Sequence, residues 1–167
     1  MKKILLVIPF MGLLFSCNLF NTIAKKEKNA DHEILLKSAL AEFKKSKKIY
    51  AFELNPLDTM ASERICSYAI KKEFNRLSKY YKNVMEFLLS DSTLYEVDYI
   101  PIKQPFYPTL AFKPNKKSNV SCMLSFGTEE IAFSNNDSTY TTYRLNNINS
   151  FRRLRDEILY MDSLNRE

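Results

Sequence analysis

The chain has 167 residues, of which 46% are hydrophobic and 26% charged, and this is enough for one domain with a real core. Its two glycines, Gly12 and Gly127, lie far apart in the chain, so it has neither a phosphate-binding glycine loop nor a Gly-x-Ser-x-Gly nucleophile elbow, which need glycines close together. The net charge of +6 comes from the N-terminal part, because residues 49–167 hold equal numbers of basic and acidic side chains. This balance of charge in the domain gives no indication of nucleic-acid binding.

The first 17 residues have the parts of a signal sequence. Two lysines, at positions 2 and 3, precede an apolar run over residues 4–15. That run is too short to span a bilayer as a helix, which needs roughly 20 residues. Its end, Leu14-Phe15-Ser16-Cys17, resembles the lipobox of bacterial lipoproteins. The resemblance implies that residues 1–16 are a cleaved signal peptide and that Cys17 carries a diacylglyceryl group and a further acyl chain, such as palmitate.

The lipobox also implies where the protein is held. Residues 17–30, the acylated cysteine and a polar tether, would join a membrane to a single α+β domain over residues 31–167. The expected partner is therefore the lipid bilayer, reached through Cys17. Asn18 follows the cysteine, where some bacteria use aspartate to retain lipoproteins on the inner membrane, and no acidic cluster follows it. By resemblance to these sorting signals, we expect the cell envelope, at an outer membrane facing the periplasm where the cell has two membranes.

Residues 18–48 hold eight lysines and four acidic residues. Basic side chains beside a lipid anchor favour contact with an anionic membrane surface. Lysines also favour the C-terminal end of a helix, where they would form a solvated face. Both interpretations fit the sequence.

Hydrophobic periodicity and turn residues predict an α+β fold, an antiparallel meander sheet packed against two or three helices. Residues 64–71 fit either a strand or a helix, and residues 95–108 are rich in aromatic residues and proline and predict an ordered loop with extended pieces. Apolar residues from Ile70 to Leu88, spaced by four and three, fit a core face or a coiled-coil seam. The helices are expected over residues 31–45, 78–89 and 147–164, and the strands over 48–54, 109–113, 120–126, 130–134 and 139–145.

The layout of strand, helix, meander and closing helix resembles small uncharacterised bacterial extracytoplasmic domains. The points of likeness are Phe112-Lys113-Pro114 at a strand end and residues 122–126 in the next strand. This resemblance implies no activity.

Lipidation of Cys17 leaves two cysteines, Cys66 and Cys122. In an oxidising compartment the pair can form a disulfide. The alternative is two separate buried thiols, which pack as small apolar side chains. A structural zinc site is not expected, because the chain has one histidine, His32, near its N-terminal end.

The sequence predicts no catalytic residues, no metal and no cofactor. Glu129 and Glu130 are adjacent, and neighbouring side chains of a strand point to opposite faces, so they would not share a glycosidase-like site. Aromatic side chains suit recognition, so the aromatic loop offers a candidate binding surface, with packing onto the core as the alternative for most of its rings. The residues of this surface are Tyr95, Tyr99, Phe106 and Tyr107.

Three functions fit these observations. The first is a binding or interaction module of the cell envelope, which the absence of a catalytic motif favours because function resides in sites. The second is an inhibitor or immunity lipoprotein that blocks a secreted protein. The third is an enzyme of a type that these motifs do not identify, so the expectation is a protein that is not an enzyme.

Overall fold

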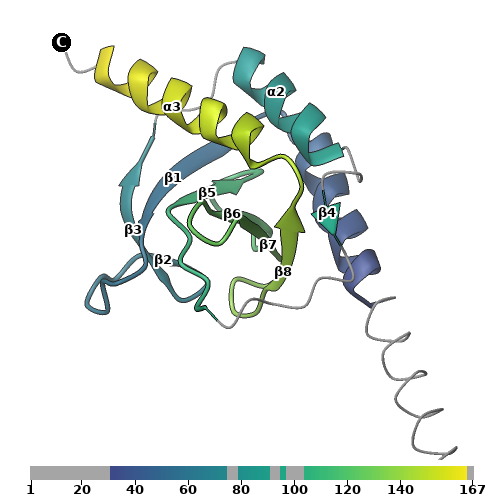
Figure 1. Cartoon of the computed structure of the whole chain (residues 1–167), viewed down its shortest axis with the longest axis horizontal. Coiled ribbons are helices and arrows are strands. Elements are labelled where there is room, and N and C mark those ends of the chain that lie inside the picture. Colours follow the sequence, from purple (N-terminus) through teal and green to yellow (C-terminus); the bar gives the residue numbers. More distant parts are fainter. Residues whose placement is uncertain (1–30, 75–78, 91–94, 97–103, 165–167) are drawn as a thin grey trace, which may run out of the picture.

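The computed structural model describes residues 31–74, 79–90, 95–96 and 104–164. The predicted signal peptide, Cys17, the predicted tether and Tyr99 lie outside these residues. An eight-stranded antiparallel sheet curls round, and three helices of the described part pack against it (Figure 1). This is the α+β fold that the sequence predicts.

The sheet has the strand order β2-β3-β1-β5-β6-β7-β8-β4. Strands β5 to β8 pair each with the next, which confirms the predicted meander. The short strand β4 precedes β5 in the sequence but pairs with β8 at one edge of the sheet. The strands are β1 (Tyr50–Asn55), β2 (Arg64–Ile65), β3 (Tyr68–Glu73), β4 (Tyr95–Glu96), β5 (Leu110–Lys113), β6 (Ser121–Ser125), β7 (Glu130–Ser134) and β8 (Thr141–Leu145).

The ambiguous segment 64–71 belongs to a hairpin of β2 and β3. Cys66, in the turn, has a φ of 53°, so it lies in the left-handed region that L-residues rarely adopt. Arg64 stabilises this corner by donating hydrogen bonds to the carbonyl oxygens of Ala61 and Ser67. The alternative prediction of a coiled-coil seam starting at Ile70 is wrong, because Ile70 lies in β3, a strand that also pairs with β1.

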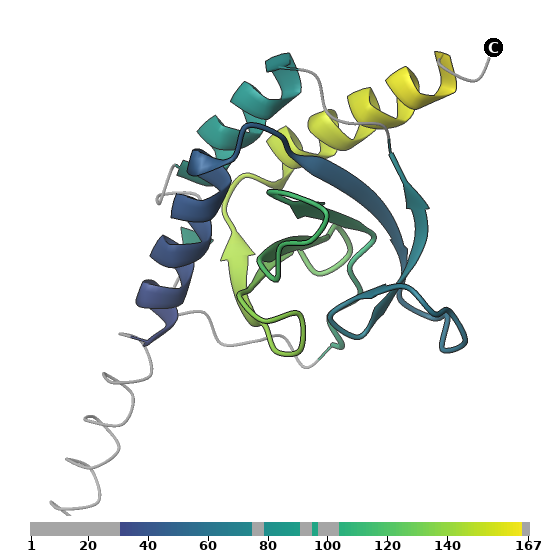
Figure 2. The ribbon, with the colours of Figure 1, turned by 180° about the vertical axis from the view of Figure 1, so that it is seen from behind.

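The helices cover residues 31–45, α2 (Lys79–Ser90) and α3 (Ile148–Leu164). The three helices lie along one side of the curled sheet (Figures 1 and 2). Each has an apolar stripe, and the three stripes pack with one face of the sheet in what we call the helix-side core. None of the helices in the described ranges combines the length and apolar composition needed to cross a membrane. The helical residues buried in this core are Leu36, Ala39, Phe43, Met85, Leu88, Leu89, Ile148, Phe151, Leu154 and Ile158.

A second core lies on the opposite face of the sheet. Its centre is a row of paired residues, Phe52, Ala111, Met123 and Ala132, each the cross-strand partner of the next. Tyr68 and Phe106 close this core, and the Tyr68 hydroxyl donates a hydrogen bond of 2.9 Å to the Phe106 carbonyl oxygen. Strands β5, β6 and β7 are therefore buried on both faces along their whole length.

The turn between β7 and β8 forms without glycine, as the composition requires. The Asn136 Oδ1 atom accepts hydrogen bonds from the backbone N–H groups of Ser138, at 3.1 Å, and Thr139, at 2.9 Å. Asp137 adopts a φ of 56°, and aspartate tolerates this conformation better than most residues. Short polar side chains thus stabilise this turn, where many hairpins use glycine.

Candidate functional site

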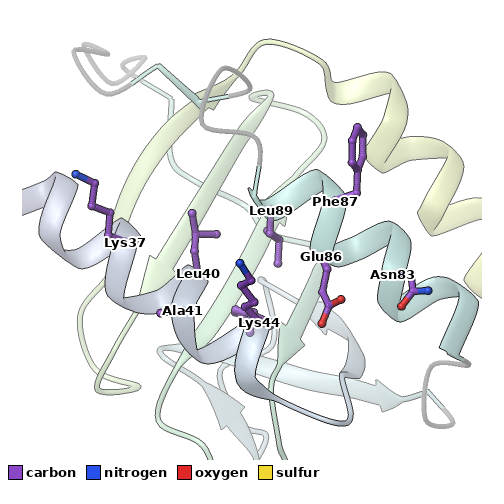
Figure 3. Close-up of a pocket in the computed structure, with 9 residues that line it drawn as sticks. Lys37, Leu40, Ala41, Lys44, Asn83, Glu86, Phe87 and Leu89 are labelled. Carbon is purple, nitrogen blue, oxygen red and sulfur yellow. The ribbon is translucent and has the colours of Figure 1, made fainter.

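A groove runs between the helix of residues 31–45 and α2 (Figure 3). Its volume of ≈ 530 Å³ lies within the range of about 300–1,000 Å³ that is typical of ligand pockets. Both helices present apolar and charged side chains to it. The nine lining residues are Lys37, Leu40, Ala41, Phe43, Lys44, Asn83, Glu86, Phe87 and Leu89.

The packing of the two helices explains why the groove is apolar at its base. Phe43 and Leu89 are buried in the helix-side core, and the partly buried Leu40 packs against that core. Ala41 contributes only a methyl group, so it leaves space between the helices. Phe87 also lines the groove, and 68% of its surface is exposed.

Charged groups surround this base, and most are already paired. The Lys37 ammonium lies 2.6 Å from the Glu33 carboxylate, and Glu86 lies 3.0 Å from Lys82. Lys44 is exposed and forms no ion pair with any side chain that the structure describes. The groove therefore has one cation whose charge is not balanced by a described neighbour.

The aromatic residues predicted as a binding surface are not gathered in one place. Tyr95 is buried in the helix-side core and donates a hydrogen bond of 2.9 Å to the Leu88 carbonyl oxygen. Phe106 is buried in the second core, on the other face of the sheet. Tyr107 is exposed, and Tyr99 lies outside the described residues. Two of the three described rings thus pack onto the protein itself.

Cys66 and Cys122 are both free thiols, so the structure does not contain the disulfide between them. The Cys66 thiol lies beside the Ser121 and Ser134 hydroxyls, whereas Cys122 is buried in the helix-side core. Ser121 and Cys122 are consecutive residues of β6, and consecutive side chains of a strand point to opposite faces. The sheet itself therefore separates the two thiols.

The two thiols are expected to react differently with iodoacetamide at pH 8. Burial raises the pKa of the Cys122 thiol, and burial also raises that of Cys66 against the opposing effect of the two serine hydroxyls. The thiolate is the reactive form. Peptide mass spectrometry of the folded protein should show slow labelling of half-buried Cys66 and none of Cys122, with both labelled in urea. Recovery of a Cys66–Cys122 disulfide peptide before reduction would contradict this arrangement.

Among the described residues, the acidic and histidine side chains considered in the sequence have different surroundings. Glu129 lies 3.5 Å from Arg152, whereas the adjacent Glu130 is buried at the start of β7. The ring of His32 meets Tyr143 edge to face, and its carbonyl oxygen accepts a hydrogen bond from the Tyr143 hydroxyl. Across the described ranges, no three His, Cys, Asp or Glu side chains group where they could hold a metal ion.

The groove was not predicted from the sequence. The apolar stripes of its two helices were visible in the sequence, but nothing in them indicated that the helices lie side by side. No protein family, no curated protein and no solved structure matches this chain.

Proposed function

We propose that this protein is a membrane-anchored extracytoplasmic lipoprotein that acts as a binding module of the cell envelope. The lipobox at residues 14–17 supports the anchor, and the polar tether supports a domain held close to the bilayer. In a cell with two membranes, we place it at the outer membrane facing the periplasm, on the sorting pattern that begins at Asn18.

One observation carries the binding role, namely the groove between the helix of residues 31–45 and α2. Ligand sites are concave and mostly apolar, with a few polar groups that orient the ligand. Leu40, Ala41 and Phe87 supply the apolar surface, and Lys44 supplies a charge for orientation. The groove also belongs to the helix nearest the tether in sequence, which would keep it near the membrane.

Photo-cross-linking in living cells tests this role. A photoreactive amino acid at Ala41 is expected to capture a discrete ligand, because this exposed residue lines the groove. The matched control places the same amino acid at Leu57, which is 78% exposed in the turn after β1 and does not line the groove. Equal capture at both positions, or none at Ala41, would refute the groove as the binding site.

A further inference from the structure

We infer that the ligand of the groove is an anionic phospholipid of the membrane, with one acyl chain between the two helices and its head group at Lys44. This inference rests on the proposed function, since it names the ligand class of the same site. Four features of the groove support this inference: its size, its apolar base, its charge and its place in the chain.

The size of the groove favours a slender ligand over a protein. Nine residues line it, whereas a standard protein–protein interface uses roughly 20–30 residues on each side. Along the first helix the lining runs from Lys37 to Lys44, which is about 10 Å at a rise of 1.5 Å per residue. A single acyl chain needs no more contact residues than these.

The base of the groove requires an apolar partner. Leu40 and Ala41 offer hydrocarbon surface, and the exposed ring of Phe87 adds to it. Covering these groups removes apolar surface from water, which is the main favourable term in binding an acyl chain.

The charge around the groove selects the head group. Lys37 pairs with Glu33, and Glu86 pairs with Lys82, so Lys44 is the cation of the groove lining that has no ion pair with a described side chain. Lys47 and Lys48 follow at the same end of the helix and are exposed. An anionic head group would contact this end of the helix, where a zwitterionic one would gain less.

The place of the groove in the chain indicates the source of the lipid. By the lipobox, 13 tether residues separate Cys17 from residue 31, and a fully extended tether of that length reaches on the order of 40 Å. The lipoprotein would therefore hold the groove within reach of the bilayer that anchors it. Membrane phospholipid is then the most concentrated amphiphile near the site.

Vesicle cross-linking tests the inference with the lipidated protein as it is purified from membranes. The protein is reconstituted into phosphatidylcholine vesicles that contain a few per cent of phosphatidylglycerol with a photoreactive acyl chain, and adducts are mapped by mass spectrometry. We expect adducts within residues 37–44 and 83–89. Photoreactive phosphatidylcholine with the same acyl chain should give several-fold fewer adducts.

Two lysine variants separate head-group recognition from general attraction. Lys44→Glu should lower the yield of phosphatidylglycerol adducts at least fivefold. That change corresponds to the loss of about 1 kcal/mol of binding free energy between the lysine and the head group. Lys45→Glu is the matched control, because Lys45 is an exposed neighbour that does not line the groove. Ala41→Phe, which fills the groove, should abolish the adducts, and the lysine pair still decides the question if that variant does not fold.

The outcomes distinguish this inference from the function on which it rests. Equal yields with the two lipids, or equal effects of the two lysine variants, would overturn the inference. A protein or a free fatty acid captured at Ala41 in cells would also overturn it, while the groove would remain a binding site. If the photoreactive amino acid at Ala41 captures nothing, both the phospholipid inference and the proposed binding role of the groove are refuted.

Discussion

Replacing Cys17 with alanine is expected to abolish incorporation of labelled palmitate and to leave the chain at its precursor length. In lipoproteins the thiol receives the diacylglyceryl group, and cleavage before the cysteine follows, so a methyl side chain stops both steps. Stable anchoring needs several acyl chains, because a single chain binds a membrane only marginally. Since Cys17→Ala removes the thiol that is acylated, the loss of labelling should be complete.

Two further cysteines provide matched controls for this experiment. Cys66→Ala and Cys122→Ala each remove a thiol from the folded part of the chain and should leave labelling and processing unchanged. Intact mass spectrometry of the three variants gives the site of cleavage and the mass of the attached lipid. Labelling of the Cys17→Ala chain, or cleavage at the same bond in it, would show that residues 14–17 are not a lipobox.

Phe133→Ala is expected to lower the free energy of unfolding by about 3–5 kcal/mol. Phe133 is fully buried in the helix-side core, and its ring meets those of Tyr95 and Tyr143 edge to face at centroid distances of 5.9 Å. Truncation leaves a cavity between three strands that the neighbouring side chains cannot fill, since protein cores are closely packed. Natural domains are stable by only about 5–15 kcal/mol, so the loss is large.

The measurement is urea unfolding of the purified protein, followed by far-ultraviolet circular dichroism. Phe87→Ala is the matched control, because it removes the same side chain from a position that is 68% exposed, and surface changes usually stay within about 0.5 kcal/mol. Similar losses in both variants would mean that the helix-side core is not packed as described. A fall in the slope of the Phe133→Ala transition would instead indicate a less cooperative native state.

The elements after residue 108 were predicted from the sequence to within about two residues. Local rules decide them, because each strand is bounded by polar turn residues such as Asn135 to Ser138. Residues 64–71 were ambiguous for the opposite reason. A two-residue strand and a turn at Cys66, with no glycine to mark it, leave no local signal.

The burial of β5 to β7 on both faces also could not be predicted from the sequence. Lys113 at the end of β5 illustrates this, because a lysine in a strand normally predicts a solvent face. It is buried, and its ammonium pairs at 2.8 Å with the Asp137 carboxylate, 24 residues further along the chain. Such a pairing depends on how the sheet brings β5 and the β7–β8 turn together.

Local sequence patterns specify the α+β class, the meander and the apolar side of each helix, and they predict the lipid anchor, because all of these depend on neighbours a few residues apart. Long-range packing alone brings the helix of residues 31–45 beside α2 and places Cys66 and Cys122 on opposite faces of the sheet. Periodicity specifies which side of an element must be covered, but not which other element covers it. Strands β1, β2 and β3 separate the two helices in the chain, so the groove exists only once both helices have packed on the same sheet.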